Sequence, residues 1–207
     1  MEPQNILSFI SSRASAKVPG GGDVSLDEVI RALEVATSAP SAHNAQPWRF
    51  VIVKDSRVKE KLIEEMAALW RDDLRRDGLD EKIIDETVRT STGRSMKASV
   101  IIVVCLTMED MHKYPDDRRR MCEYIMAVQS VAAAIENMLL AFHAMGISAC
   151  WRSSALFAPE VVKRVLKIPD SFEPQAIVEV SRGGISSKPP RKPLSEVACL
   201  NFWGNPV

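Results

Sequence analysis

Helical and strand-like patterns of apolar residues alternate along this chain, and no segment is repeated. Apolar positions spaced three or four residues apart predict helices over 6–10, 26–36, 58–74, 79–90, 121–145 and 159–166. Short apolar and β-branched runs predict strands over 49–54, 99–106, 147–151 and 176–180. This mixture, in a chain of 207 residues, predicts one α+β domain over residues 1–207.

Polar residues mark where several of these helices begin and end. Ser25 and Glu28 form a capping-box pattern, and Asp55 is placed to cap the following helix. The proline and glycine run over 17–22 cannot stay helical. Gly146 is expected to end the longest helix.

Two apolar segments predict how the layers pack. The strand over 99–106 lacks polar alternation, which is typical of a central strand buried on both faces. The helix over 121–145 is apolar nearly all round, so it should be buried on several sides. In so small a chain this predicts contact with a second copy. The polar stretch over 107–120 is expected to be a loop.

The composition excludes several classes of protein. Lys and Arg together number 27, as do Asp and Glu, so no net charge attracts nucleic acid or an anionic membrane. The N-terminus has no secretory pattern, and the apolar runs are shorter than the roughly 20 residues needed to cross a bilayer. Four widely spaced cysteines without a CxxC pair predict reduced, mostly buried thiols, so we expect a cytoplasmic protein.

The three histidines do not predict a metal site. His43, His112 and His143 show no ligand-like spacing with one another or with the cysteines. His43 alone could act as an acid or base, although a single histidine in a loop is more often merely exposed.

The first candidate for binding chemistry is Arg13-Ala14-Ser15-Ala16-Lys17. In an extended chain alternate side chains share a face, so Arg13, Ser15 and Lys17 could converge on one anion. A solvated basic turn explains the same residues, and on this segment alone it is the preferred interpretation.

The second candidate is the segment from Pro40 to Trp48, where Ser41, Asn44 and Gln46 lie between prolines just before a strand. Prolines fix the backbone while the hydroxyl and amides offer donors and acceptors, which suits the polar edge of a heteroaromatic ring. The plainer interpretation is a helix-to-strand loop built from turn-forming residues.

The third candidate, Lys188-Pro189-Pro190-Arg191-Lys192-Pro193, lies in a tail that is predicted to be extended. It is either a basic polyproline tail or a segment that returns Arg191 to the anion of Arg13. The sequence alone does not choose between the two.

In this order, these three segments resemble the FMN-binding signatures of the nitroreductase superfamily and span nearly the whole chain. The stretch from Gly146 to Ser154 also resembles the family's strand beside the reactive nitrogen of the flavin. Together with Phe172-Glu173-Pro174, it is most similar to the nitroreductase-like domain of some deazaflavin-coenzyme glutamyl ligases.

The resemblance implies a three-layer α+β fold, with a mainly antiparallel sheet between helices and FMN at a homodimer interface. Arg13, Ser15 and Arg191 would hold the phosphate, and Lys17 with Arg94 would lie near the pyrimidine edge. Ser153 and Ser154 would offer backbone N–H groups, while Pro40, Ser41 and Asn44 would come from the opposite subunit. The full cofactor set it implies is Arg13, Ser15, Lys17, Pro40, Ser41, Ala42, Asn44, Gln46, Arg94, Ser153, Ser154, Lys188 and Arg191.

Some positions depart from the family pattern. Lys17 stands where many relatives have arginine, Ala42 where serine is frequent, and Ser91 where some members have an asparagine that contacts the ring. The contact made by Ser91 is therefore in doubt, and the loop over 107–120 carries no recognisable substrate signature.

The resemblance implies an FMN-dependent oxidoreductase that takes hydride from NADH or NADPH and reduces an electron-poor acceptor, a nitroaromatic or quinone, by a ping-pong mechanism. No side chain need act as a general acid, because the flavin carries the redox chemistry. The alternatives are a reductase or dehydrogenase for a specific metabolite or deazaflavin cofactor, and a flavin-binding module without turnover.

Overall fold

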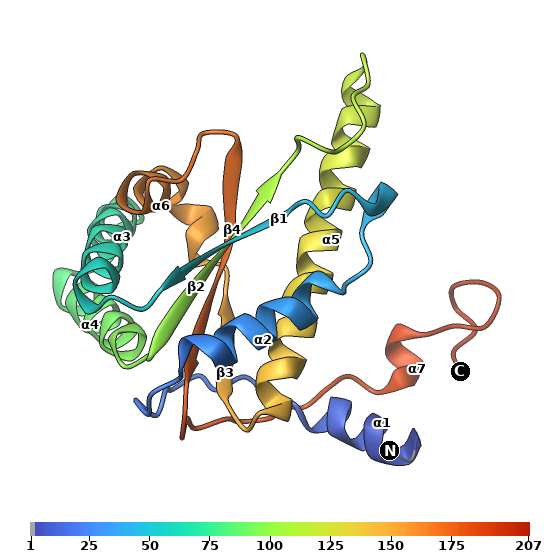
Figure 1. Ribbon diagram of the computed structural model, residues 1–207, viewed down its shortest axis with the longest axis horizontal. Coiled ribbons are helices and arrows are strands. Elements are labelled where there is room, and N and C mark those ends of the chain that lie inside the picture. Colours follow the sequence, from blue (N-terminus) through green and yellow to red (C-terminus); the bar gives the residue numbers. More distant parts are fainter. Residues whose placement is uncertain (1–2) are drawn as a thin grey trace.

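A computed structural model describes residues 3–207, which form a helical layer, a sheet and a second helical layer (Figure 1). The sheet is antiparallel throughout, with strand order β1-β2-β4-β3. Its strands are β1 (Trp48–Val53), β2 (Val100–Thr107), β3 (Ser148–Arg152) and β4 (Phe172–Ser181). This architecture confirms the predicted three-layer α+β class.

Different helices cover the two faces of the sheet (Figure 1). One face carries α2 (Leu26–Thr37) and α5 (Asp117–Ala144). On the other side lie α3 (Ser56–Arg76), α4 (Glu81–Met96) and α6 (Pro159–Leu166). Outside the layers are α1 (Pro3–Ser12) and α7 (Leu194–Val197), and two short 3-10 turns, η1 (Ala42–Asn44) and η2 (Ser154–Phe157), flank the sheet.

The central strand β2 explains why both layers are needed. All eight of its residues are buried. Ile102 and Val104 face the core formed with α2 and α5, whereas Ile101 and Val103 face the core formed with α3 and α6. Because successive residues of a strand point to opposite faces, an unbroken apolar run requires cover on both sides.

The long helix α5 packs in the core but keeps an apolar surface. Its inward face, including Phe142 and Met138, is fully buried. By length and composition the helix could cross a membrane, yet this face is occupied by contacts within the domain. Met121 and Ile125 remain 58% and 47% exposed, so part of the apolar surface predicted to meet a second copy is uncovered in the single chain.

Several helices and strands begin or end at other residues than predicted, because capping side chains or pairing with a neighbouring strand make them longer. α5 begins at Asp117 rather than 121, because Asp116 caps it by accepting from the Arg119 N–H at 3.0 Å. The predicted loop over 107–120 is therefore shorter. α4 continues beyond residue 90 to Met96, and β4 begins at Phe172, which pairs with Thr107. The short helix α7 was not predicted.

Close backbone contact brings the beginning of the chain to its end. Val18 pairs with Ile185, and Gly22 pairs with Arg182, as isolated bridges. A Cβ atom on Gly20 would lie 2.2 Å from the Gly183 carbonyl carbon, so only glycine fits there. This contact carries the first and third candidate segments to the same side of the domain.

Replacing Gly20 with alanine should therefore weaken the fold. The added methyl group would meet backbone atoms that cannot rotate away, and we expect the free energy of unfolding to fall by about 1–3 kcal/mol. Gly93→Ala is the matched control, because a Cβ there meets no atom within 4 Å and Gly93 lies inside α4. It should be neutral or stabilising by up to about 1 kcal/mol. Urea denaturation compares the two, and equal stability of both variants would contradict the contact.

Candidate functional site

The first and third candidate segments lie beside the edge strand β3. The Ala16 N–H donates to the Ala149 carbonyl at 3.0 Å, which fixes the Arg13–Lys17 segment along the strand. Lys188 Nζ donates to the Ser11 carbonyl at 2.6 Å, so the tail passes the same place. Arg13 lines a cavity of about 230 Å³ there. Arg13 and Ser186, far apart in sequence, thus line one small cavity, and Lys188 follows two residues after Ser186.

The arginines of these segments make local contacts in the single chain. Arg13 Nε donates to Glu136 Oε1 at 3.2 Å, an exposed pair of the kind that contributes at most about 1 kcal/mol. Arg191 Nη1 donates to the Pro189 carbonyl at 3.1 Å, within its own segment. The predicted convergence of Arg13 and Arg191 on one anion therefore stays a prediction.

A buried carboxylate, that of Glu179, connects α4, β3 and the segment that ends at Lys17. Glu179 of β4 is 3% exposed and accepts from Ser95 Oγ at 2.5 Å and from Arg152 Nε at 2.6 Å. Arg152 also donates through Nη2 to the Lys17 carbonyl at 3.1 Å. Because a buried charge needs both an opposite charge and hydrogen bonds, this cluster holds α4, β3 and the N-terminal segment in fixed positions.

Sequence reasoning missed Glu179 and Arg152 as positioning residues. Glu179 interrupts an otherwise apolar run, Ala176-Ile177-Val178-Glu179-Val180, and a charge within a central strand needs a buried partner. That interruption is the signal that could have found it. The sequence does not identify its partner, because Arg152 is 27 residues away along the chain.

Arg94 stands next to this cluster with an unused donor. Its Nε is buried and has no hydrogen-bond partner among residues 3–207. Burial raises the pKa of the neighbouring Cys150 thiol, while the positive charges of Arg152, Lys17 and Arg94 act in the opposite direction. Lys17 and Arg94, predicted to lie near one edge of a ring, are thus both close to Cys150. A buried donor between cations favours an oxygen-rich or anionic partner.

Ser153 and Ser154 follow directly after β3 and are exposed. They line a cavity of about 640 Å³ between the sheet and α3 and α4. Its lining is mainly apolar and includes Trp70, Trp151 and Phe157. A cavity of this size and character suits an aromatic group of small-molecule dimensions.

We call Arg13, Ser15, Lys17, Arg94, Ser153, Ser154, Lys188 and Arg191 the edge half-site.

The Pro40–Gln46 segment lies elsewhere, against α5, and we call it the loop half-site. The Ala42 N–H donates to Ser130 Oγ, and the Gln46 N–H donates to Ser41 Oγ, both at 3.1 Å. Asn44 and Gln46 have φ angles of 53° and 48°, in a region that non-glycine residues seldom adopt. Their side chains are exposed. Such backbone strain is concentrated at functional sites, so this loop is built to present polar groups outward.

The two half-sites are held apart by α5. Ser130 anchors the loop half-site, whereas His143 contacts Ser12 at 2.8 Å beside the edge half-site. Thirteen residues of helix place these anchors about 20 Å apart along the axis. Neither of the two cavities described above is lined by residues of the loop half-site.

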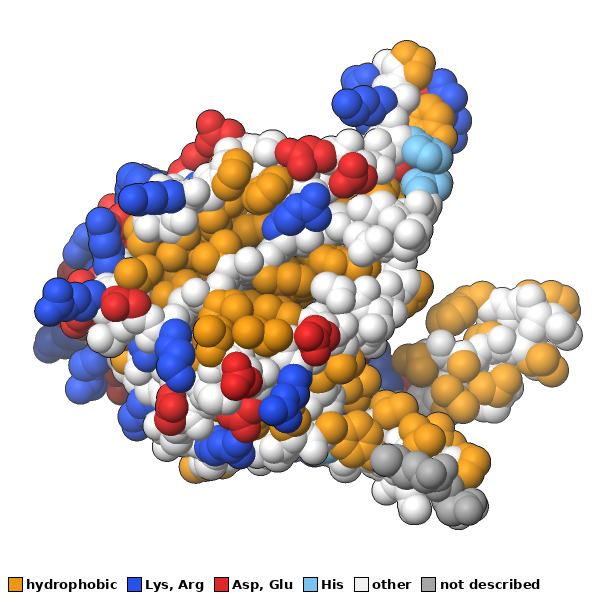
Figure 2. All heavy atoms as spheres, in the orientation of Figure 1, with side chains coloured by type: hydrophobic (Ala, Val, Ile, Leu, Met, Phe, Trp, Pro, Cys, Tyr) orange, Lys and Arg blue, Asp and Glu red, His pale blue; other side chains and the backbone are white. Residues whose placement is uncertain are grey.

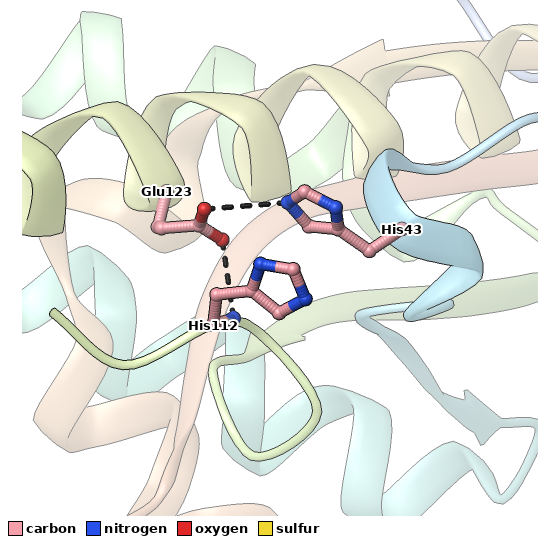
Figure 3. Close-up of side chains that lie close together, drawn as sticks. All are labelled: His43, His112 and Glu123. Atoms are coloured by element: carbon pink, nitrogen blue, oxygen red, sulfur yellow. Dashed lines mark hydrogen bonds and ion pairs between the residues drawn. The ribbon is translucent and has the colours of Figure 1, made fainter.

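Two of the three histidines, which show no ligand-like spacing in the sequence, lie next to each other in the fold. The rings of His43 and His112 stack with centroids 3.8 Å apart, next to the carboxylate of Glu123 (Figure 3). Their separation of 69 positions in the sequence hid this cluster, which forms only because the loop half-site and the β2–α5 connection meet on α5.

Comparison with known proteins identifies the family. The nitroreductase family model matches residues 20–183, so the chain belongs to the nitroreductase family. An Archaeoglobus fulgidus protein, provisionally named an NADH dehydrogenase/NAD(P)H nitroreductase, is 30% identical over 149 residues, or 72% of this chain and 67% of that protein. An iodotyrosine deiodinase from Haliscomenobacter hydrossis is 25% identical, over 86% of this chain and 82% of its own.

Solved structures share the fold. A BluB-like flavoprotein from Clostridium difficile 630 has a TM-score of 0.78 at 22% identity, covering 97% of this chain and 99% of its own. A nitroreductase with bound FMN from Desulfitobacterium hafniense has a TM-score of 0.71 at 20% identity, covering 97% and 99%. The predicted family is confirmed, and the closer similarity to ligase-attached domains stays a prediction.

Removing the Arg152 side chain tests the buried cluster. Arg152→Met should lower the free energy of unfolding by about 3 kcal/mol, because it leaves the buried Glu179 carboxylate without its cation. Arg152→Lys keeps the charge and should lose less. Chemical denaturation measures both. If Arg152→Met were as stable as the parent, Glu179 would not depend on this ion pair.

Proposed function

We propose that the protein is a homodimeric, FMN-dependent oxidoreductase whose flavin lies where the edge half-site of one copy meets the loop half-site of the other. The observation that carries this proposal is the buried Nε of Arg94, which has no hydrogen-bond partner among residues 3–207. A flavin offers carbonyl oxygens and a ring nitrogen at its pyrimidine edge, which matches that unused donor and the surrounding positive charge.

The residues of the edge half-site fit the parts of FMN in order. Arg13 lines the small cavity, and Ser15, Lys188 and Arg191 belong to the two segments that pass it. All four suit the phosphate, since guanidinium and ammonium groups make charge-assisted bonds to phosphate oxygens. To bind the phosphate, Arg13 would give up its weak ion pair with Glu136. Lys17 and Arg94 would bind the pyrimidine edge.

The remaining contacts complete the ring site. The backbone N–H groups of Ser153 and Ser154 would face the reactive nitrogen. From the second copy, the loop half-site would add Pro40, Ser41, Ala42, Asn44 and Gln46. The outward, left-handed backbone at Asn44 and Gln46 supports this assignment, because the loop presents its polar groups away from its own chain.

Uncovered apolar surface supports the homodimer. α1 and the C-terminal segment project from the body with apolar side chains on their surfaces (Figure 2). Phe202 and Trp203 are 73% and 80% exposed, and Met121 of α5 is 58% exposed. Single exposed apolar residues are ordinary, but projecting arms with large aromatic groups are typical of an interface. A second copy would bury these arms and supply the missing half-site.

Bound FMN would supply two-electron chemistry, with NADH or NADPH as the donor and a nitroaromatic or quinone as the acceptor. The chain binds and orients: its cations favour the anionic reduced cofactor, and the apolar walls of the larger cavity exclude water. We expect no general acid among its side chains. Cytoplasmic location remains our expectation. Cys105 and Cys150 are buried, whereas Cys122 is exposed and Cys199 is partly exposed, so only half of the thiols are buried as predicted.

Removing the unused donor tests the cofactor assignment. The purified protein should show a flavin absorption spectrum and release FMN rather than FAD. Arg94→Met should weaken FMN binding about 10- to 100-fold, the equivalent of one charged hydrogen bond of 1.5–3 kcal/mol. Arg89→Met, an exposed arginine on the same helix, should bind FMN like the parent. A colourless protein that ignores added FMN would refute the proposal.

Kinetics test the proposed reaction. Donor and acceptor would use one cleft in turn. Double-reciprocal plots of initial rate against donor concentration, at several fixed acceptor concentrations, should therefore give parallel lines, the pattern of a ping-pong mechanism. Intersecting lines would contradict a shared cleft. If neither NADH nor NADPH bleached the bound flavin, a flavin-binding module without turnover, or an enzyme with a different donor, would replace this proposal.

A further inference from the structure

Three side chains from three separate segments converge at the N-terminal part of α5 (Figure 3). His43 comes from η1, His112 from the β2–α5 connection, and Glu123 from α5 itself. One ligand-capable atom from each lies within 4.8 Å of the other two. The histidines stand at the surface, and histidine side chains are visible there below a projecting tip of the molecule (Figure 2).

We propose that His43, His112 and Glu123 bind a divalent transition-metal ion of the Zn²⁺ type. Two imidazoles and a carboxylate form a ligand set suited to zinc and its borderline neighbours, and three protein ligands leave the fourth position to water. None of these three residues is assigned to FMN, so the metal site does not depend on the proposed function.

The distances already approach those of a metal site. His43 Nε2 lies 3.3 Å from Glu123 Oε1. Two ligand atoms on one tetrahedral zinc ion are ~3.3 Å apart, given bonds of about 2.0–2.1 Å. The exposed ring of His112 stacks on that of His43, and one of its nitrogens lies within 4.8 Å of the ligand atoms of His43 and Glu123.

The burial of Glu123 gives the strongest electrostatic reason for a cation. The residue is 2% exposed, and its second carboxylate oxygen accepts from the His112 N–H at 3.2 Å. Among residues 3–207 its only ion-pair partner is His43, and no lysine or arginine pairs with it. A buried carboxylate normally has a permanent cation beside it. A bound metal ion would supply that charge, and the backbone N–H already orients the carboxylate as an outer partner does in metal sites.

Metal binding would fix the loop half-site. His43 precedes Asn44, and its own φ of 56° lies in the left-handed region. An ion shared with Glu123 and His112 would clamp this strained loop and the β2–α5 connection to the same helix. The ion would therefore act on the position of the loop, with no part assigned to it in electron transfer.

Zinc titration of the tag-free, chelator-treated flavoprotein tests the proposal. Isothermal titration calorimetry should detect one Zn²⁺ per chain, and elemental analysis after dialysis should give the same ratio. His112→Gln keeps the backbone N–H that donates to Glu123 and should weaken Zn²⁺ binding at least 10-fold. Even the loss of a residue that only hydrogen-bonds to a metal ligand weakens metal binding by about that much. Glu123→Gln should weaken it similarly.

His143→Gln is the matched control, because His143 is the one remaining histidine and lies near the opposite end of α5. It should bind Zn²⁺ like the parent. Circular dichroism checks that each variant is folded, and this readout requires neither metal nor flavin. Two results would overturn the proposal: no Zn²⁺ binding by the parent protein, or binding that His112→Gln and Glu123→Gln leave unchanged.

Discussion

The fixed rise of α5 determines where both parts of the candidate site lie. The middle of the helix anchors the loop half-site through Ser130, and its C-terminal end contacts Ser12, beside the edge half-site, through His143. A helix packed against the sheet and α2 cannot shorten, so about 20 Å separate the two anchors. Under the proposed function, a second copy would complete each half-site. The same helix keeps apolar side chains such as Met121 uncovered, so geometry and exposed surface both favour a second copy.

At the edge half-site, a buried ion pair and a glycine contact set the positions of the cations. Glu179, held by Arg152 and Ser95, ties α4 to the edge of the sheet. The approach of Gly20 to Gly183 brings the N-terminal segment and the basic tail together. These constraints act before any cofactor binds. Within the described part of the chain, residues 3–207, they leave the buried Nε of Arg94 without a hydrogen-bond partner. A buried donor of this kind is expected where a ligand completes the hydrogen bonding.

Much of the fold could be predicted from local patterns. The unbroken apolar run of β2 required two helical layers, and the Ser25–Glu28 capping box forms as predicted. Element ends were less predictable, because Asp116 and the pairing of Phe172 with Thr107 depend on neighbours distant in sequence. The motif residues of the site were recognisable, but their partners were not. Glu179 with Arg152, and His43 with His112, meet only through the tertiary fold, so spacing along the chain could not reveal them.

A mixed dimer tests most directly whether two chains share each site. One chain would carry Arg94→Met and the other Asn44→Ala, with different affinity tags so that the heterodimer can be isolated. If the half-sites of opposite chains combine, one of the two sites is intact and the other carries both changes. The heterodimer should then retain about one FMN per dimer, while both variant homodimers lose theirs. If each chain built its own site, every site would carry one defect. A heterodimer as colourless as the variant homodimers would therefore contradict the account.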